Sequence, residues 1–395
     1  MIICLIIWNG ISREPDIACR VRTFTFRPGH LCNLLQQEHG KWPHRRVANN
    51  VANNILDRSH LILDRPEVDR IRTLKPKTIQ QMVLNIMKNL TSLTCLNIEI
   101  PSTDHIAVSQ TTPSFFFQGW QAFGRNLTTL KLIVPLESLH LVLPTSLSIT
   151  GLRTLSVEVF RAFHSDLDET VIMQKTLLPF INSHRTITSL AVEAPKGINL
   201  SFLLQHLILM PSLRTFSLNQ PFVSLLEADL SGLHQFLDAH QTRIRDLSIK
   251  ITAPFSPHYP HYPDLDTFFA QKCFRVPLPV IERLTLFYSP VYYTTGFASY
   301  IGQYKSTLTS LTIKGQNFDD DELSSLITHL ATFGILRELD ISIISLKPRV
   351  FRLLSVDLPN LEVLTLRFMS VASYIYDGDL RMSVGLPLKA SIDVF

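Results

Sequence analysis

Asp238 and His240 are the two side chains of this sequence whose types and spacing best match an acid–base pair. They lie two residues apart in "FLDAHQTRIRDLSIK", and a carboxylate that orients an imidazole is common in general acid–base catalysis. The upstream stretch "FINSHRTITSLAV" repeats this shape, with Asn182 in place of the aspartate and His184 in place of the histidine. Because an amide replaces the carboxylate, we predict a repeated structural position, where a histidine meets the partly negative carboxyl end of a helix. No catalytic residue is expected.

A second pair of histidines lies in the stretch "SPHYPHYPD", where His258 and His261 stand three residues apart. Histidines at this spacing bind a metal when further ligands converge on it. The prolines between and beside them, Pro257, Pro260 and Pro263, prevent a helix that would direct both imidazoles to one point. We therefore expect no metal and predict a protruding loop over residues 253–264 that contacts a partner. Its contact residues are His258, Tyr259, His261 and Tyr262.

Two more stretches imitate ligand sites. "GWQAFGRN" is close to the phosphate-binding pattern G-x-x-x-x-G-K-[ST], but Arg125 and Asn126 replace the lysine and the hydroxyl. No strand precedes this stretch, so we predict a helix that packs Trp120 and Phe123 inward. "DDDEL" at 319–323 and "HSDLDE" at 164–169 place carboxylates where helices begin, which the helix dipole favours. No cofactor is expected.

The composition indicates a folded protein, since 46% of the 395 residues are hydrophobic and 18% are charged. The formal net charge is +4, but residues 1–80 alone hold 13 Lys and Arg against 7 Asp and Glu. This basic flank has no nucleic-acid-binding motif, so we expect no nucleic-acid partner. The five cysteines form no C-x-x-C pair, which favours reduced thiols in the cytoplasm or nucleus. The opening "MIICLIIW" is too short to span a bilayer, and no membrane association is expected.

An internal repeat accounts for most of the chain. The pattern L-x-x-L-x-L, with any bulky apolar residue allowed, occurs ten times, and "VRTFTF" at Val21 opens the array as an eleventh copy. In each copy the second and third apolar residues lie two apart and share one face of a strand. A stretch with apolar residues at helical spacing precedes most copies, as at 171–181 and 323–330. The ten motifs begin at Leu93, Leu127, Leu152, Ile187, Leu213, Ile244, Ile281, Leu308, Leu336 and Leu361.

Helix followed by strand, repeated, predicts an α/β fold in which each unit covers the next. We expect a right-handed solenoid with the shape of a horseshoe, a parallel sheet on its concave face and helices on its convex face. The predicted domains are an N-terminal flank at 1–20, ten to eleven irregular repeats at 21–370, and a C-terminal cap or tail at 371–395.

These repeats resemble leucine-rich repeat proteins, and more closely the fungal F-box-associated ones, whose repeats read F-L-x-x-H-x-x-T-L-x-x-L-x-L. The stretches at 180–192 and 236–250, which contain His184 and His240, and "YIGQYKSTLTSLTI" at 300–313 show the similarity. The resemblance implies a substrate-recognition module of a ubiquitin ligase. Only twenty residues precede Val21, fewer than an F-box needs, so a cullin adaptor is expected only if an F-box is supplied or is missing from this sequence. The repeats also depart from the family by placing proline at the ninth position of four motifs: Pro101, Pro135, Pro195 and Pro221.

The concave face is the predicted binding surface. The residue after the third apolar position of each motif faces this side. Along the chain these positions carry acids first and bases later, which would orient a partner of opposite polarity. The residues predicted to bind it are Glu99, Glu158, Glu193, Lys250, Phe287, Lys314 and Arg367.

The function predicted from the sequence is a non-enzymatic scaffold that holds a protein partner. One alternative is an extracellular receptor-type repeat domain, since three N-x-[ST] sequons occur, although two of them fall where the repeat pattern itself explains them. An uncharacterised enzyme is the other alternative. The sequence contains no phosphate loop and no nucleophile elbow, and its motifs supply no nucleophile with a matching base.

Overall fold

The structure is a computed structural model in which the chain forms two compact units, Met1–Ile187 and Thr188–Phe395. The residues that the structure describes are 16, 19–27, 76–100, 113–143, 149–162, 168–195, 198–221, 229–252, 269–288, 295–371 and 389–394.

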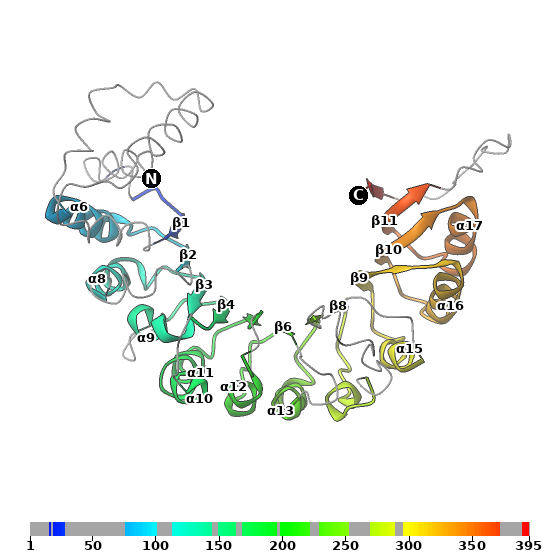
Figure 1. Cartoon of the computed structure of the whole chain (residues 1–395), viewed down its shortest axis with the longest axis horizontal. Coiled ribbons are helices and arrows are strands. Elements are labelled where there is room, and N and C mark those ends of the chain that lie inside the picture. Colours follow the sequence, from blue (N-terminus) through cyan, green and yellow to red (C-terminus); the bar gives the residue numbers. More distant parts are fainter. Residues whose placement is uncertain are drawn as a thin grey trace, which may run out of the picture. The chain divides into compact units, whose positions relative to one another are not determined.

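The first unit has four described strands, which pair in chain order, all of them parallel. They are β1 (Thr23–Phe26), β2 (Cys95–Glu99), β3 (Thr129–Pro135) and β4 (Thr154–Phe160). Figure 1 shows the helices of this unit on one side of the strands. The helices are α6 (Pro76–Asn89), α8 (Pro113–Phe123), η1 (Leu136–Ser138), α9 (Leu139–Val142), α10 (Glu169–Ile172), η2 (Met173–Leu177) and α11 (Leu178–Ser183).

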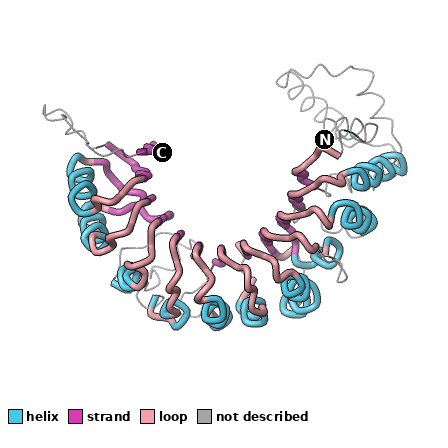
Figure 2. The backbone as a smooth tube through the Cα atoms, turned by 180° about the vertical axis from the view of Figure 1, so that it is seen from behind, coloured by secondary structure: helices cyan, strands magenta, loops and turns pink. Residues whose placement is uncertain are grey.

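The second unit repeats this arrangement with eight parallel strands, again paired in chain order. They are β5 (Ser189–Glu193), β6 (Thr215–Pro221), β7 (Asp246–Thr252), β8 (Arg283–Tyr288), β9 (Ser310–Phe318), β10 (Glu338–Leu346), β11 (Val363–Val371) and β12 (Lys389–Val394). Its helices also lie on one side of the sheet, as Figure 2 shows from behind. They are α12 (Ser201–His206), α13 (Ser231–His240), η3 (Lys272–Arg275), α15 (Thr295–Gly302), α16 (Asp320–Leu330) and α17 (Pro348–Asp357).

The repeat motifs form the strands as predicted. The ten motifs give β2 to β11, and the copy at Val21 gives β1. The second and third apolar residues of a motif are buried, as Leu96 and Ile98 in β2 and Leu247 and Ile249 in β7. The predicted α/β solenoid of leucine-rich-repeat type is therefore confirmed. The sheet face opposite the helices, predicted as the concave face, is called the open face from here on.

Two features of the strands are less visible in the sequence. No repeat motif predicts β12, which adds a parallel strand to β11. Proline marks strand ends, since Pro135 and Pro221 are the last residues of β3 and β6. A residue that cannot donate to the next strand fits at such an end.

A shared backbone carbonyl fixes the start of each strand against its neighbour. The carbonyl of Arg22 accepts the N–H groups of both Thr94 and Cys95, each at 2.9 Å. The carbonyl of Thr94 accepts those of Thr128 and Thr129 in the same way. The strand register is therefore set at one position per repeat, immediately after the first apolar residue of the motif. Further carbonyls that accept two N–H groups are those of Thr128, Thr188, Arg214, Arg245, Glu282, Thr309 and Arg337.

The helical stretch at 169–183 departs from the expected pattern. The sequence predicts Val171 on the apolar side of this helix, but its side chain is 39% exposed. The cause is a π-helical turn at Met173–Leu177, which shifts the phase of the helix. Pro179 follows this turn, and because proline has no N–H to donate to the preceding turn, a regular α-helix would leave a carbonyl without its partner. Met173 and Phe180, on the two sides of this shift, are buried.

A close contact between α12 and α13 requires glycine at position 232. The N–H of Gly232 donates to Oγ of Ser201 at 2.9 Å. A Cβ added to Gly232 would lie 1.9 Å from the carbonyl oxygen of Ser201, which is a backbone atom. The two helix starts therefore approach each other only because this residue has no side chain.

We predict that Gly232→Ala destabilises the protein by about 1 to 3 kcal/mol, because the added methyl group forces the helices apart. In an ordinary helix the same change would stabilise by about 0.5 to 1 kcal/mol, so the sign of the effect is the test. Urea unfolding followed by circular dichroism measures the difference. Gly334→Ala is the matched control, since its Cβ would meet nothing within 4 Å. A Gly232→Ala protein as stable as the natural one would contradict the close contact.

Candidate functional site

His240 is a buried structural residue whose two ring nitrogens are both used. Its side chain is 0% exposed. Its Nδ1 lies 2.8 Å from the carbonyl oxygen of Phe236, and its Nε2 accepts the N–H of Met210 at 3.0 Å. This pattern requires a neutral imidazole with the proton on Nδ1. Asp238 is exposed, so the spacing that suggested an acid–base pair brings no pair together.

His184 makes the same two contacts in the first unit. Its Nδ1 lies 2.6 Å from the carbonyl oxygen of Phe180, and its Nε2 accepts the N–H of Ile149 at 2.8 Å. Both histidines therefore join the end of their own helix to the connection that precedes the previous strand. The predicted structural role is confirmed, with one correction to its cause. Burial lowers the pKa of both rings, so a neutral hydrogen bond, and not a cation at the helix end, makes the contact.

The connections at Ile149 and Met210 explain why histidine occurs in these two repeats. Where a helix runs up to the motif, the N–H at this position bonds within the helix, as Leu90 does to Ile86 and Leu358 does to Leu354. Met210 instead follows residues 207–209, which are not helical. A buried N–H without a partner is costly. The histidine of the next repeat supplies the missing acceptor.

The other imitations of ligand sites are also structural. Trp120 and Phe123 are buried in α8, and Nε1 of Trp120 donates to the carbonyl of Val142 at 2.9 Å. Asp319 caps α16 by accepting the N–H groups of Asp321 and Glu322. Asp168 caps α10 by accepting the N–H of Thr170 at 2.9 Å. These carboxylates serve helix starts, as the sequence predicted.

Burial limits the reactivity of one described cysteine, Cys273. Burial raises the pKa of the Cys273 thiol to about 12, so this thiol stays protonated at neutral pH and is a poor nucleophile. Over the same described ranges, no group of three or more His, Cys, Asp or Glu is placed to hold a metal ion. None of the helices described is both long and apolar enough to cross a bilayer.

The predicted binding residues form rows on the open face of each unit. In the first unit, Glu99, Ile133 and Glu158 are aligned across β2, β3 and β4. In the second unit, one row runs from Glu193 in β5 to Lys314 in β9. Its members are Glu193, Asn219, Lys250, Phe287 and Lys314.

Two of the predicted charges, Glu99 and Arg367, are neutralised within the protein, which changes the predicted polarity. Glu99 accepts a hydrogen bond from Nε of Arg27 at 2.6 Å. Arg367 binds both carboxylate oxygens of Asp340, through Nη1 and through Nη2 at 2.5 and 3.1 Å. Glu193 accepts a hydrogen bond from Nδ2 of the neutral Asn219 amide at 2.9 Å. Arg367 therefore presents little net charge, and the basic character of the second unit's row lies in Lys250 and Lys314.

Lys250 and Lys314 are the register partners of Phe287 on the two strands that flank β8. Nζ of Lys250 is 4.9 Å from the centroid of the Phe287 ring. Lys314 pairs with Phe287 in the strand register from the other side. Neither lysine has an ion-pair partner among the described residues. The row thus combines an aromatic surface with two cations.

A bulge in β9 shifts the strand register next to this row. Between the pairs Thr312 with Asp340 and Asn317 with Ser342, β9 advances five residues while β10 advances two. Gly315 stands in this bulge with φ 86°, a conformation that costs glycine little. The strands β9, β10 and β11 have nine residues each, whereas the other described strands have four to seven.

The longer strands expose an apolar pair that the sequence patterns did not identify. Leu339, Ile341 and Ile343 of β10 are buried, so Ile344 falls on the open face, where it is 44% exposed. By the same alternation Met369 of β11 is on this face and is 62% exposed. The two residues are aligned, because Ile343 pairs with Phe368 and Ser345 with Ser370. Strand length beyond the six-residue motif is the feature that would have found them.

The four loop residues predicted to contact a partner, His258, Tyr259, His261 and Tyr262, lie outside the described residues. They stay predictions.

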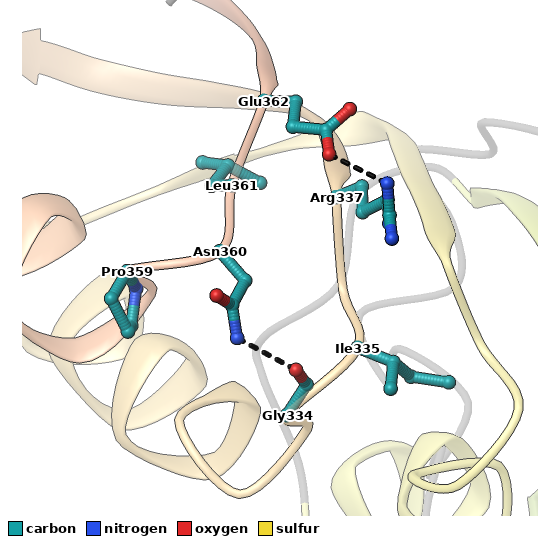
Figure 3. Close-up of a pocket in the computed structure, with 7 residues that line it drawn as sticks. All are labelled: Gly334, Ile335, Arg337, Pro359, Asn360, Leu361 and Glu362. Carbon is teal, nitrogen blue, oxygen red and sulfur yellow. Dashed lines mark hydrogen bonds and ion pairs between the residues drawn. The ribbon is translucent and has the colours of Figure 1, made fainter.

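A pocket of about 450 Å³ lies where the turns after α16 and α17 lead into β10 and β11. Figure 3 shows that its polar groups bond to one another, Arg337 to Glu362 at 2.7 Å and Asn360 to the Gly334 carbonyl at 2.8 Å. It therefore offers few free polar groups to a ligand. Its lining residues are Gly334, Ile335, Arg337, Pro359, Asn360, Leu361 and Glu362.

Comparison with known proteins shows that this chain is similar in fold to a solved structure. No protein-family profile matches the chain. No curated protein matches it either. The chain is similar to a solved structure described as the crystal structure of the Rad7 and Elc1 complex in yeast, with 14% sequence identity and a TM-score of 0.46. The similarity covers 78% of this chain and 77% of that one.

The neutral histidines predict a loss of stability in acid. Because the folded-state pKa of His184 and His240 lies below the ordinary 6.5, the unfolded chain binds more protons as the pH falls below about 6.5. We expect the free energy of unfolding to be constant above that pH, as far as these groups determine it, and to decrease below it. Urea unfolding between pH 7.5 and pH 5 measures this.

His240→Leu tests the assignment directly. Leucine is apolar and suits a buried site, but it leaves the N–H of Met210 without an acceptor, at a cost of about 1 to 3 kcal/mol. The variant should also lose part of the pH dependence. His206→Leu is the control, since His206 is exposed although its Nδ1 lies 2.9 Å from the Phe202 carbonyl oxygen. An unchanged pH profile in His240→Leu would refute the role assigned to this ring.

Proposed function

We propose that this protein is a non-enzymatic scaffold that binds a protein partner on the open face of its sheet. The observation that supports this most directly is the alignment of charged and aromatic side chains on that face, from Glu193 to Lys314 in the second unit. Helices cover the other face of the sheet in each unit (Figure 2). A solenoid builds such a surface from one position per repeat, so a partner is recognised by many weak contacts and not by one pocket.

Within this function, the resemblance of the repeats to F-box-associated leucine-rich repeats suggests a substrate receptor that works in the cytoplasm or nucleus. The partner held on the open face would then be a protein that is to be ubiquitinated. A cullin adaptor would join through an F-box that is supplied by another subunit or is missing from this sequence. Affinity purification of the tagged full chain, with a search for a copurifying cullin adaptor, tests this narrower proposal.

Site-specific photocrosslinking tests the scaffold itself. A photoreactive amino acid is placed at Thr312 or Thr365, which are half-buried on the open face, or at Thr328 or Arg352, which are exposed on α16 and α17. After irradiation in an extract of the cells that express the protein, mass spectrometry identifies the crosslinked proteins. We expect the two open-face positions to capture the same protein and the two helix positions not to capture it. Capture from the helix positions alone would contradict the proposal.

A further inference from the structure

The second unit carries a continuous mixed surface on its open face, which we call the β7–β11 surface. It consists of Lys250, Phe287, Lys314, Asn317, Ile344 and Met369. These residues come from five strands that neighbour one another in the sheet. Nδ2 of Asn317 lies 3.4 Å from Sδ of Met369, so these two side chains meet above β10, the strand between them.

The charge of this surface is positive. The two lysines have no carboxylate partner in the described part of the chain, whereas the nearest acid of this face, Asp340, is bound by Arg367 on two atoms. Both lysines are half-buried, so each keeps part of its charge accessible to a carboxylate, while the half-buried Phe287 ring is accessible to an apolar contact. The β7 to β9 part of the surface is therefore complementary to an acidic group.

The β10 to β11 part of the surface is apolar. Ile344 and Met369 are adjacent and exposed, although large apolar side chains favour burial. Methionine adapts its shape to different apolar partners. Because the apolar pair continues from the lysine pair across the same sheet, one occupant must match a charged part and an apolar part together.

The size of the surface sets the length of its occupant. Neighbouring strands lie about 4.8 Å apart, so the distance from β7 to β11 is roughly 19 Å. An extended peptide rises about 3.3 Å per residue. A segment of about six residues therefore reaches from the lysines to the apolar pair.

From the proposed function and these observations, we infer that the β7–β11 surface binds a short extended segment of a partner protein that carries carboxylates at one end and large apolar side chains at the other. The carboxylates pair with Lys250 and Lys314, on the two strands that flank Phe287. The apolar side chains cover Ile344 and Met369. Arg367 takes no part in this pairing, since its charge is neutralised by Asp340.

Peptide selection on the purified full chain tests this inference. A display library of random eight-residue peptides is selected, and a fluorescein-labelled copy of an enriched peptide is titrated by anisotropy. We expect enriched peptides to combine Asp or Glu with Leu, Ile, Phe or Met. The double variant K250E/K314E should weaken binding at least tenfold, and I344D/M369D by a similar factor. Arg367 is left intact, because a carboxylate there would face Asp340 and disturb the fold.

The control variant is K272E/K305E, which reverses two exposed lysines outside the strands and should bind as the natural protein does. Thermal unfolding checks that all variants are folded. The inference is overturned if no peptide is enriched, if the enriched peptides lack acidic residues, or if K250E/K314E binds unchanged. In each of these cases the photocrosslinking result is independent. Crosslinks from Thr312 and Thr365 would leave the scaffold in place and remove only the acidic segment as its partner.

Discussion

Coverage of each strand by its neighbour is the constraint on which each unit depends. A single repeat buries only a few apolar side chains, roughly 1.5 to 3 kcal/mol for each, whereas ordering its backbone costs about 1 to 2 kcal/mol per residue. The backbone depends on the neighbouring strand as well, because two N–H groups at the start of one strand bond to a carbonyl just before the preceding strand. The open face is a product of this stacking, because its rows exist only while the register holds.

The sequence predicted this architecture well because the two-residue spacing of apolar residues in each motif follows from the geometry of a strand. Two apolar residues at spacing two, repeated ten times, leave few folds available, and β2 to β11 lie where the motifs place them. The local exceptions have causes that periodicity does not contain. Val171 is exposed because a π-helical turn shifts the helix face. Gly232 is required by a contact with Ser201 in the previous repeat, which no pattern within one repeat shows.

The candidate site was predictable as a set of rows and less so as a distribution of charge. Alternation in the strands placed Glu193, Lys250, Phe287 and Lys314 on one face correctly. The ion pair between Arg367 and Asp340 is diagonal across two strands, so a reading of one column at a time misses it. The sequence patterns did not identify Ile344 and Met369 because these residues lie beyond the six-residue motif, in strands of nine residues.

The hydrogen bonds of His184 and His240 limit when two connections can complete their contacts during synthesis of the chain. The N–H groups of Ile149 and Met210 receive their acceptor from a side chain that lies 35 and 30 residues later in the chain. On a ribosome, these connections stay incomplete until the following repeat has emerged and its helix has formed. Until then each connection is an incomplete part of the fold, of the kind that chaperones and proteases recognise.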